Sequence, residues 1–487
     1  MGVVFSLLAV VNGRGVAVPN TFYWYDLETS GTEPRWDRIV QFAGLRTDSE
    51  LNEVGDAWCT YVSLPDDVLP SPGASLVTGI TPQIARERGI SEWRALRRID
   101  KLFREPNTCV AGYNNLRFDD EFVRYGLYRN LMDPYAREWQ NGNSRWDIID
   151  LVRAAGALRP DGIEWPVDEE GLPVYSLERV AAENGLDHGH AHDALSDARA
   201  TVALARLVRE KQPRLFAYHF AGRYKRRARE LLEPAGARLC IHVSGMYPRE
   251  RKGLAPVVSI CRHPENSNSI IVADLGEDVE MLLDWPEERI RDALFTPNAP
   301  VRPPLKEVRI NKCPFVAVAD VVTEADAERL QFDRGLARQR MRRLKGPGIA
   351  EKIQRVYARG RAAPQPDVDA ALYEGFLKDE DKARCESFNR ELAADRWVDL
   401  DYRDGRLKTL AARLKARGFA AWQNADERAE WRTWVRDKLD ANEAPWLTLR
   451  RFETDVTAML ESATGRRREV LLALRAHGEE LRTAYGL

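Results

Sequence analysis

The pattern of apolar and polar positions predicts a mixture of strands and helices over the first two hundred residues. Aromatic and β-branched stretches bounded by Gly, Pro or Asn predict strands, and apolar residues at helical spacing predict helices. The expected strands are TFYWYDLE (21–28), QFAGLRTD (41–48), WCTYVSL (58–64) and NTCVAGYN (107–114). The expected helices cover 91–103, 118–131, 147–158, 176–185 and 193–211. Strands that alternate with helices in this way are typical of an α/β domain with a mixed sheet.

The pattern changes near residue 208. Short strand candidates separated by Pro, Gly and Asn turns follow at 238–246, 254–263, 269–275 and 307–319, which predicts a small β-rich, barrel-like domain. RGRAAPQPDVD (359–369) is a Pro- and Ala-containing linker, and helical patterns follow it. We therefore divide the chain into an N-terminal extension (1–20), an α/β domain (21–207), a β-rich domain (208–362) and a helical C-terminal domain (363–487).

Composition and charge mainly exclude some classes of protein. The chain has 487 residues, which suits about three domains, and 73 basic against 75 acidic residues. A formal net charge of −2 produces no global field that would attract a nucleic acid, so any polyanion site must come from local clusters such as RYKRRAR (223–229). Six scattered cysteines without C-x-x-C spacing fit a reducing compartment, and we expect a cytoplasmic protein. The first six residues fit a myristoylation pattern, but we interpret the segment as a plain extension.

Acidic residues occur where the expected strands end and the expected helices begin. Asp26 and Glu28 stand one residue apart at the end of a strand, so both side chains point to the same face. Asp119 and Asp120 fall in the first turn of a helix, where they would also complement the helix dipole. Spacing alone does not distinguish these two. Asp197 lies in the first turns of a helix that we expect to start near Asp193.

Histidine accompanies the acids in GLDHGHAHDALSD, where His188, His190 and His192 alternate. Alternate histidines could bind Zn²⁺. No other part of the sequence supplies a zinc framework, and carboxylates favour hard cations such as Mg²⁺ or Mn²⁺. Two such ions can stabilise the attacking and leaving oxygens of a phosphodiester, and a histidine near neutral pH can accept a proton. Asp147 and Asp150 also compete for a metal-binding role, but we interpret both as helix-start acids.

The order Asp-x-Glu, then Asp, then His-x₄-Asp resembles the DEDDh exonucleases, the superfamily of polymerase proofreading domains. The phrases RPDGIEWP, GYNNLRFDDEFVR, NSRWDIIDLVRA, QPRLF, HVSGM, RHPEN and INKCP are similar to those of a bacterial member of that superfamily, from about residue 21 to beyond 375. The resemblance implies a ribonuclease-H-like exonuclease domain with a mixed sheet, a Src-homology-3-like β-barrel domain and an all-helical C-terminal domain, closed into a C-shaped clamp around one strand.

The resemblance also implies roles for individual residues. Asp26, Glu28, Asp119 and Asp197 would hold two Mg²⁺ ions, for which Mn²⁺ could substitute, and His192 would be the general base. Glu28 would thus belong to both the metal and the catalytic sets. Residues at matching positions would contact single-stranded DNA: Arg124, Tyr135, Trp139, Arg153, Ser176, Lys225, Asn268, Lys306, Asn311 and Tyr373. Ser176 departs from the basic residue usual there, which weakens one contact. Ile80, in SLVTGITP, could pack against the 3′-terminal base or simply be core.

We therefore expect a monomeric, processive 3′→5′ exonuclease that degrades single-stranded DNA to 5′-mononucleotides in bacterial DNA repair and recombination. The same chemistry on RNA stays open, because contacts to the 2′-hydroxyl decide that preference. A catalytically silent nucleic-acid clamp would be expected to lack at least one member of the catalytic set, and all five are present. A proofreading subunit would have no evident use for the second and third domains. The resemblance implies one protein partner, the acidic C-terminal tail of single-stranded-DNA-binding protein.

Overall fold

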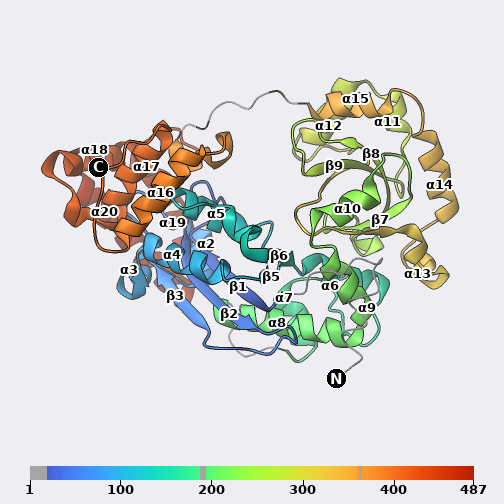
Figure 1. Ribbon diagram of the computed structural model, residues 1–487, viewed down its shortest axis with the longest axis horizontal. Coiled ribbons are helices and arrows are strands. Elements are labelled where there is room, and N and C mark those ends of the chain that lie inside the picture. Colours follow the sequence, from blue (N-terminus) through green and yellow to red (C-terminus); the bar gives the residue numbers. More distant parts are fainter. Residues whose placement is uncertain (1–18, 187–192, 359, 361–364, 366) are drawn as a thin grey trace.

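The computed structural model describes residues 19–186, 193–358, 360, 365 and 367–487. They form a mixed six-stranded sheet, a five-stranded antiparallel sheet and a helical C-terminal part. Figure 1 shows the helical part (orange to red) and the five-stranded sheet (green to yellow) on opposite sides, with the six-stranded sheet below and between them. The predicted fold class, an α/β domain followed by a β-rich and then a helical domain, is confirmed. None of the described helices is both long and apolar enough to span a membrane.

The six-stranded sheet has the order β4-β3-β2-β1-β5-β6. β1 is antiparallel to β2 and parallel to β5, so the sheet is mixed as predicted. Its strands are β1 (Thr21–Thr29), β2 (Ile39–Thr47), β3 (Trp58–Val62), β4 (Gly89–Ile90), β5 (Thr108–Gly112) and β6 (Ser144–Asp147). The helices of this domain are α2 (Pro72–Thr78), α3 (Pro82–Arg88), α4 (Glu92–Phe103), α5 (Asp119–Arg129), α6 (Ile149–Leu158), α7 (Leu177–Glu183), α8 (Ala194–Lys211) and α9 (Pro213–Ala221).

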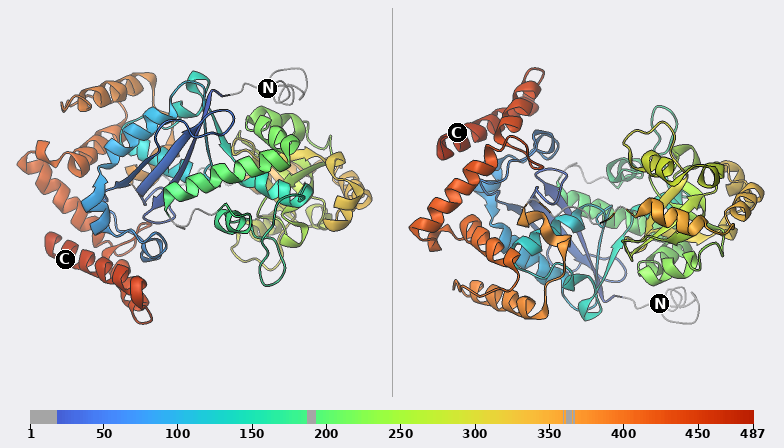
Figure 2. Two further views of the ribbon diagram at one scale, coloured as in Figure 1. Left: turned by 90° about the horizontal axis from the view of Figure 1, so that it is seen from below. Right: turned by 90° about the horizontal axis from the view of Figure 1, so that it is seen from above.

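Alternation along β1 distributes its side chains between two cores. Phe22 and Trp24 belong to the core shared with α6 and α8, whereas Tyr23 and Tyr25 belong to the core shared with α4 and α5. The sheet is therefore covered on both faces, and Figure 2 shows α8 as the long green helix beside the blue strands. Because side chains in a strand alternate, residues 26 and 28 lie on the α8 face with Phe22 and Trp24.

The second domain is an antiparallel sheet with the order β10-β9-β8-β7-β11. Its strands are β7 (Cys240–Val243), β8 (Leu254–Arg262), β9 (Ser269–Asp274), β10 (Leu305–Arg309) and β11 (Phe315–Val318). Its helices are α10 (Lys225–Leu232), α11 (Glu280–Asp284), α12 (Glu287–Phe295), α13 (Glu324–Arg329), α14 (Arg334–Arg343) and α15 (Ile349–Tyr357). The insertion of α11 and α12 between β9 and β10 makes this domain less purely β than its sequence pattern predicts.

The third domain packs directly on the first. It contains the 3₁₀ segment η5 (Val368–Glu374) and helices α16 (Asp379–Leu392), α17 (Gly405–Gly418), α18 (Ala425–Leu439), α19 (Leu449–Leu460) and α20 (Gly465–Tyr485). Tyr125 and Tyr128 of α5 share a core with Phe388 and Leu410. A buried ion network reinforces this interface.

In that network Asp67 of the first domain accepts hydrogen bonds from Arg417 and Lys438 of the third. In the opposite direction, Arg38 of the first domain donates to Asp369 of the third at 3.0 Å. Buried charges are tolerated only when paired in this way, so the two domains are joined by specific polar contacts as well as by an apolar core.

Candidate active site

Three carboxylates converge where β1 ends and α8 begins. Asp26 and Glu28 project from β1 toward α8, and Asp197 stands in the first turn of that helix. Oxygen atoms of all three side chains lie within 4.8 Å of one another. The helix starts where the sequence predicts, because the side chain of Asp193 accepts a hydrogen bond from the amide of Ser196 at 3.3 Å and caps it. The described part of the site therefore combines residues 171 positions apart in the chain (26 to 197).

A fourth carboxylate borders this group. Asp119 is the first residue of α5 and is buried. It does not belong to the group whose oxygens lie within 4.8 Å, but its charge is among those that raise the pKa of Asp26. The structure thus brings all four predicted acidic ligands into one region, with oxygen atoms of three of them within 4.8 Å of one another.

The site is electrostatically unfavourable as it stands. Burial raises the pKa of Asp26 well above its usual value, and the charges of Asp119, Asp197 and Glu28 raise it further. Burial, followed by the charges of Asp197 and Asp193, raises the pKa of Glu28 to about 7. Carboxylates that repel one another in a low dielectric are stabilised by a bound cation. A set of carboxylate oxygens fits a hard divalent cation, so the residues present fit the metal that the sequence predicts.

Asp120, adjacent to Asp119, has a different environment. Its carboxylate accepts hydrogen bonds from Arg137 at 2.7 Å, from Tyr25 at 3.2 Å and from Arg145. Burial opposes ionisation, but the charges of Arg137 and Arg145 outweigh it and hold the pKa of Asp120 far below its usual value. Asp120 is therefore an ionised, fully paired structural residue, whereas Asp119 is free to serve a metal.

The two competing acids are also engaged elsewhere. Asp150 lies in the first turn of α6, as predicted, and pairs with Arg117 at 2.6 Å and Arg153 at 2.9 Å. The helix does not begin at Asp147, which is the last residue of β6, a four-residue strand that the sequence pattern did not reveal. Asp147 is nevertheless a helix-start acid, as predicted, because its side chain accepts the amide of Ile149, the first residue of α6, at 3.0 Å. Its carboxylate accepts the amide of Asn114 at 2.9 Å and thereby fixes the segment after β5.

His192, the predicted general base, lies outside the described residues, as do His188 and His190. Both its role as a base and the zinc alternative for the histidine run stay predictions. Asp193, the first described residue after them, is committed to capping α8.

Comparison with known proteins covers all three domains. Models of an exonuclease domain, an exonuclease I SH3-like domain and an exonuclease I C-terminal domain match residues 23–205, 223–359 and 366–481. Exodeoxyribonuclease I of Escherichia coli is 42% identical over 85% of this chain and 88% of its own length. The chain belongs to the exodeoxyribonuclease I family.

Solved structures of the exodeoxyribonuclease I family extend the match to most of the fold. A moderately thermophilic exonuclease I from Methylocaldum szegediense has a TM-score of 0.88 and 44% identity, covering 95% of this chain and 99% of that one. A zinc-bound complex of E. coli exonuclease I with single-stranded DNA has a TM-score of 0.89 and 38% identity, with the same coverage.

Several residues that the family resemblance assigns to DNA binding gather where the exonuclease and helical domains meet. Trp139 is 67% exposed. Tyr135 is half-buried beneath the guanidinium of Arg124, which lies 5.5 Å from its ring centre. Arg124 itself is buried, and its guanidinium donates two hydrogen bonds to Glu138. A contact between Arg124 and DNA would therefore require the hydrogen bonds to Glu138 to break. Tyr373 is exposed and packs edge-on against the ring of Tyr125.

Sequence reasoning missed one aromatic residue beside this group. Phe376 is 84% exposed, and its ring packs edge-on against Tyr135 at 5.8 Å between centres. An exposed aromatic ring beside Tyr135, three positions after exposed Tyr373, is the kind of platform on which bases stack. The only signal in the sequence was a Phe three positions after Tyr373 in LYEGF.

A second set of predicted DNA contacts lies on the SH3-like domain. Lys225 is exposed and donates to the side chain of Asn268 at 3.1 Å. The backbone of Asn268 accepts the amide of Ile310 at 2.9 Å, which brings Asn268 close to half-buried Asn311. These residues therefore lie together on one part of the domain.

Lys306 and Arg153 lie near the boundary between the exonuclease and SH3-like domains. Burial, followed by the charge of Arg117, lowers the pKa of Lys306 to about 8. The guanidinium of Arg153 lies against Gly245, where an added Cβ would be 2.7 Å from its nitrogen. Ser176 is exposed just before α7. The DNA-contacting roles of these residues stay predictions.

Ile80 is buried with Val40 and Ala85, as expected of a core residue. Val40 precedes Gln41, which pairs with Glu28 across β1 and β2.

Proposed function

We propose that this chain is a processive 3′→5′ exonuclease that hydrolyses single-stranded DNA to 5′-mononucleotides. The observation that carries the proposal is the convergence of Asp26, Glu28 and Asp197 within 4.8 Å, beside buried Asp119, in a chain of the exodeoxyribonuclease I family. A role in bacterial DNA repair and recombination, a cytoplasmic location and a monomeric state belong to the same proposal.

In this mechanism Asp26, Glu28, Asp119 and Asp197 hold two Mg²⁺ ions, with Mn²⁺ able to substitute. Bound there, the ions would supply charge stabilisation of the attacking and leaving oxygens. The side chains of the site orient the terminal phosphodiester, and His192 accepts the proton of the attacking water. The exposed rings of Trp139, Tyr373 and Phe376 offer stacking surfaces for the following bases.

The direct test is product analysis of a 5′-labelled single-stranded oligonucleotide with Mg²⁺. We expect a ladder that shortens from the 3′ end and is abolished by EDTA and by Asp26→Asn. A matched control is Glu33→Gln, since half-exposed Glu33 forms its ion pair with Arg35, two positions along the chain. Matched DNA and RNA oligomers settle the sugar preference. Binding without cleavage in either Mg²⁺ or Mn²⁺ would overturn the proposal.

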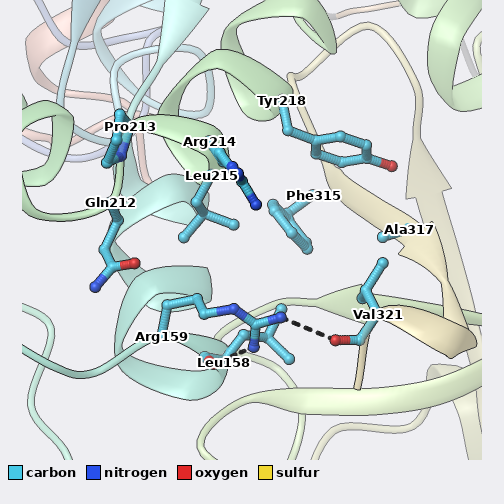
Figure 3. Close-up of a pocket in the computed structure, with 10 residues that line it drawn as sticks. All are labelled: Leu158, Arg159, Gln212, Pro213, Arg214, Leu215, Tyr218, Phe315, Ala317 and Val321. Atoms are coloured by element: carbon cyan, nitrogen blue, oxygen red, sulfur yellow. Dashed lines mark hydrogen bonds between the residues drawn. The ribbon is translucent and has the colours of Figure 1, made fainter. Parts of the chain in front are cut away.

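We further propose that the acidic, apolar C-terminal tail of single-stranded-DNA-binding protein docks in a cavity between the exonuclease and SH3-like domains (Figure 3). The cavity has a volume of about 480 Å³, and its apolar wall includes Leu215, Phe315 and Val321. Arg214 supplies positive charge at the same cavity, whereas the guanidinium of Arg159 is paired with Asp326 at 2.9 Å. Such a site suits a peptide that ends in apolar side chains and a carboxylate.

Fluorescence anisotropy with a labelled acidic tail peptide tests this partner. Arg214→Ala should weaken binding, and the effect should shrink at high salt, because the contact is electrostatic. Arg302→Ala, an exposed arginine of the same domain that does not line the cavity, is the matched control. Equal affinities for the native chain and Arg214→Ala would refute this site.

A further inference from the structure

The carboxylate of Glu121 on α5 is a point where all three domains meet. Lys312 of the second domain donates to Oε1 of Glu121 at 2.6 Å. The hydroxyl of Tyr373, from the third domain, donates to Oε2. Arg124, one turn further along α5, also donates to Oε1, at 2.9 Å. One side chain of the exonuclease domain thus accepts a hydrogen bond from each of the two neighbouring domains.

The donors around Glu121 are themselves held in place. Lys312 is buried and also donates to the carbonyl oxygen of Leu116, in the segment between β5 and α5. Arg124 is buried, is paired with Glu138 and donates to the hydroxyl of Tyr373 at 3.2 Å. Charge-assisted hydrogen bonds are strong where water is excluded. Removal of the Glu121 charge would therefore loosen contacts to both neighbouring domains at once.

Glu121 also stands close to the reaction centre along the helix. It follows Asp119, the first residue of α5, by two positions, which is about 3 Å along the helix axis. The third domain packs on the same helix through Tyr125 and Tyr128. α5 is therefore both the carrier of a predicted metal ligand and the element to which the flanking domains are attached.

From this geometry we infer that Glu121 is a positioning residue for processivity. It fastens the second and third domains to α5 and keeps both closed on the strand between successive cleavages. Glu121 acts through Lys312 and Tyr373 and does not touch the reacting atoms. The inference rests on the nuclease function proposed above.

Glu121→Gln tests this role, because it preserves the size of the side chain and removes its charge. With an excess of unlabelled competitor DNA present, the number of nucleotides removed per binding event should fall roughly tenfold, as expected for the loss of charge-assisted hydrogen bonds. The rate of a single cleavage on a saturating short oligonucleotide should be unchanged. Asp168→Asn is the matched control, since Asp168 pairs with Arg249 of the second domain away from α5, and it should leave processivity unchanged.

A double-mutant cycle separates coupling through Glu121 from a general structural effect. Lys312→Met and Tyr373→Phe should each lower processivity in the native chain, and each should lower it less when Glu121→Gln is already present, because only the contacts that do not involve Glu121 remain to be lost. Additive effects, or native processivity in Glu121→Gln, would overturn the inference. If Glu121→Gln fails to fold, the two donor variants decide alone, since effects through a shared acceptor are coupled and independent effects add. A native chain without nuclease activity would instead refute the proposed function.

Discussion

Replacing the two neighbouring aspartates of α5 by asparagine, one at a time, should have opposite consequences. Asp120 is fully buried and paired with Arg137 and Arg145. Asp119 is also buried, but burial and the charges of Asp120, Asp147 and Glu28 raise its pKa well above the usual value. The same chemical change therefore removes a stabilising charge at one position and a destabilising charge at the next.

For Asp120→Asn the structure predicts a large loss of stability. Removal of one partner leaves Arg137, which is fully buried, without its carboxylate. Breaking a buried ion pair from one side costs about 3–5 kcal/mol. For a domain of this size that corresponds to a fall in Tm of roughly 6–20 °C. Molecules that remain folded should keep their metal site.

For Asp119→Asn the expected balance is reversed. Without divalent metal, the free energy of unfolding near pH 8 should rise, because the variant no longer buries a carboxyl group whose pKa is raised well above its usual value. Cleavage of single-stranded DNA should fall roughly 10²–10³-fold, because metal charge stabilisation contributes several kcal/mol.

Thermal melts in EDTA and in Mg²⁺, together with cleavage rates normalised to folded protein, measure both effects. The native chain should gain stability on addition of Mg²⁺, and Asp119→Asn should gain less. An active Asp119→Asn variant paired with a folded, inactive Asp120→Asn variant would show that the two assignments are interchanged.

Three further predictions concern other parts of the chain. In EDTA the free energy of unfolding should fall by up to about 3 kcal/mol as the pH rises from about 4.5 to beyond 7. The reason is that folded Glu28, with a pKa of about 7, keeps a proton that the unfolded chain has lost. Thermal melts across this pH range measure the direction of the change, and Mg²⁺ should abolish it. Asp67→Asn removes the buried carboxylate shared by Lys438 and Arg417, although Arg417 keeps Asp369 as a second buried partner, and should cost about 3 kcal/mol, the lower end for a buried ion pair broken from one side. Limited proteolysis should then release the helical domain, and an unchanged cleavage pattern would contradict this. Trp139→Ala and Phe376→Ala should leave Tm unchanged, since both rings are exposed. Each should weaken single-stranded DNA binding in EDTA by about 1–3 kcal/mol, as measured by fluorescence anisotropy. Unaltered affinity would exclude base stacking on these two rings.

Strand β1 shows how far local patterning carries a prediction. The aromatic run that starts at Thr21 predicts a strand, and alternation then places residues 26 and 28 on one face. The structure adds that this face is the one covered by α8, which delivers Asp197. Periodicity predicts both elements because each pattern is contained in a short stretch of sequence. The family resemblance instead depends on the order of short acidic motifs spread from residue 26 to residue 197.

Strand β6 shows where patterning fails. Its four residues are too short for an alternation to be visible, and the apolar run that follows in α6 has helical spacing. The sequence pattern therefore predicts that the helix begins at Asp147. Its position is decided by pairing of β6 with β5 and by the amides that its carboxylate accepts, contacts that depend on the assembled sheet.

The difference between Asp119 and Asp120 also depends on contacts that form only in the assembled fold. Both are acids in the first turn of α5, and the helix dipole favours either. What separates them is the arrival of Arg137 and Arg145 from the segment before and within β6, which neutralises one carboxylate and leaves the other facing further acids. A net charge near zero conceals this separation, because the charges cancel over the chain but not at each carboxylate. The order of acidic residues in the sequence can thus predict which carboxylates bind the metal. Which arginines pair with the neighbouring carboxylates, and so keep them from binding the metal, depends on tertiary contacts.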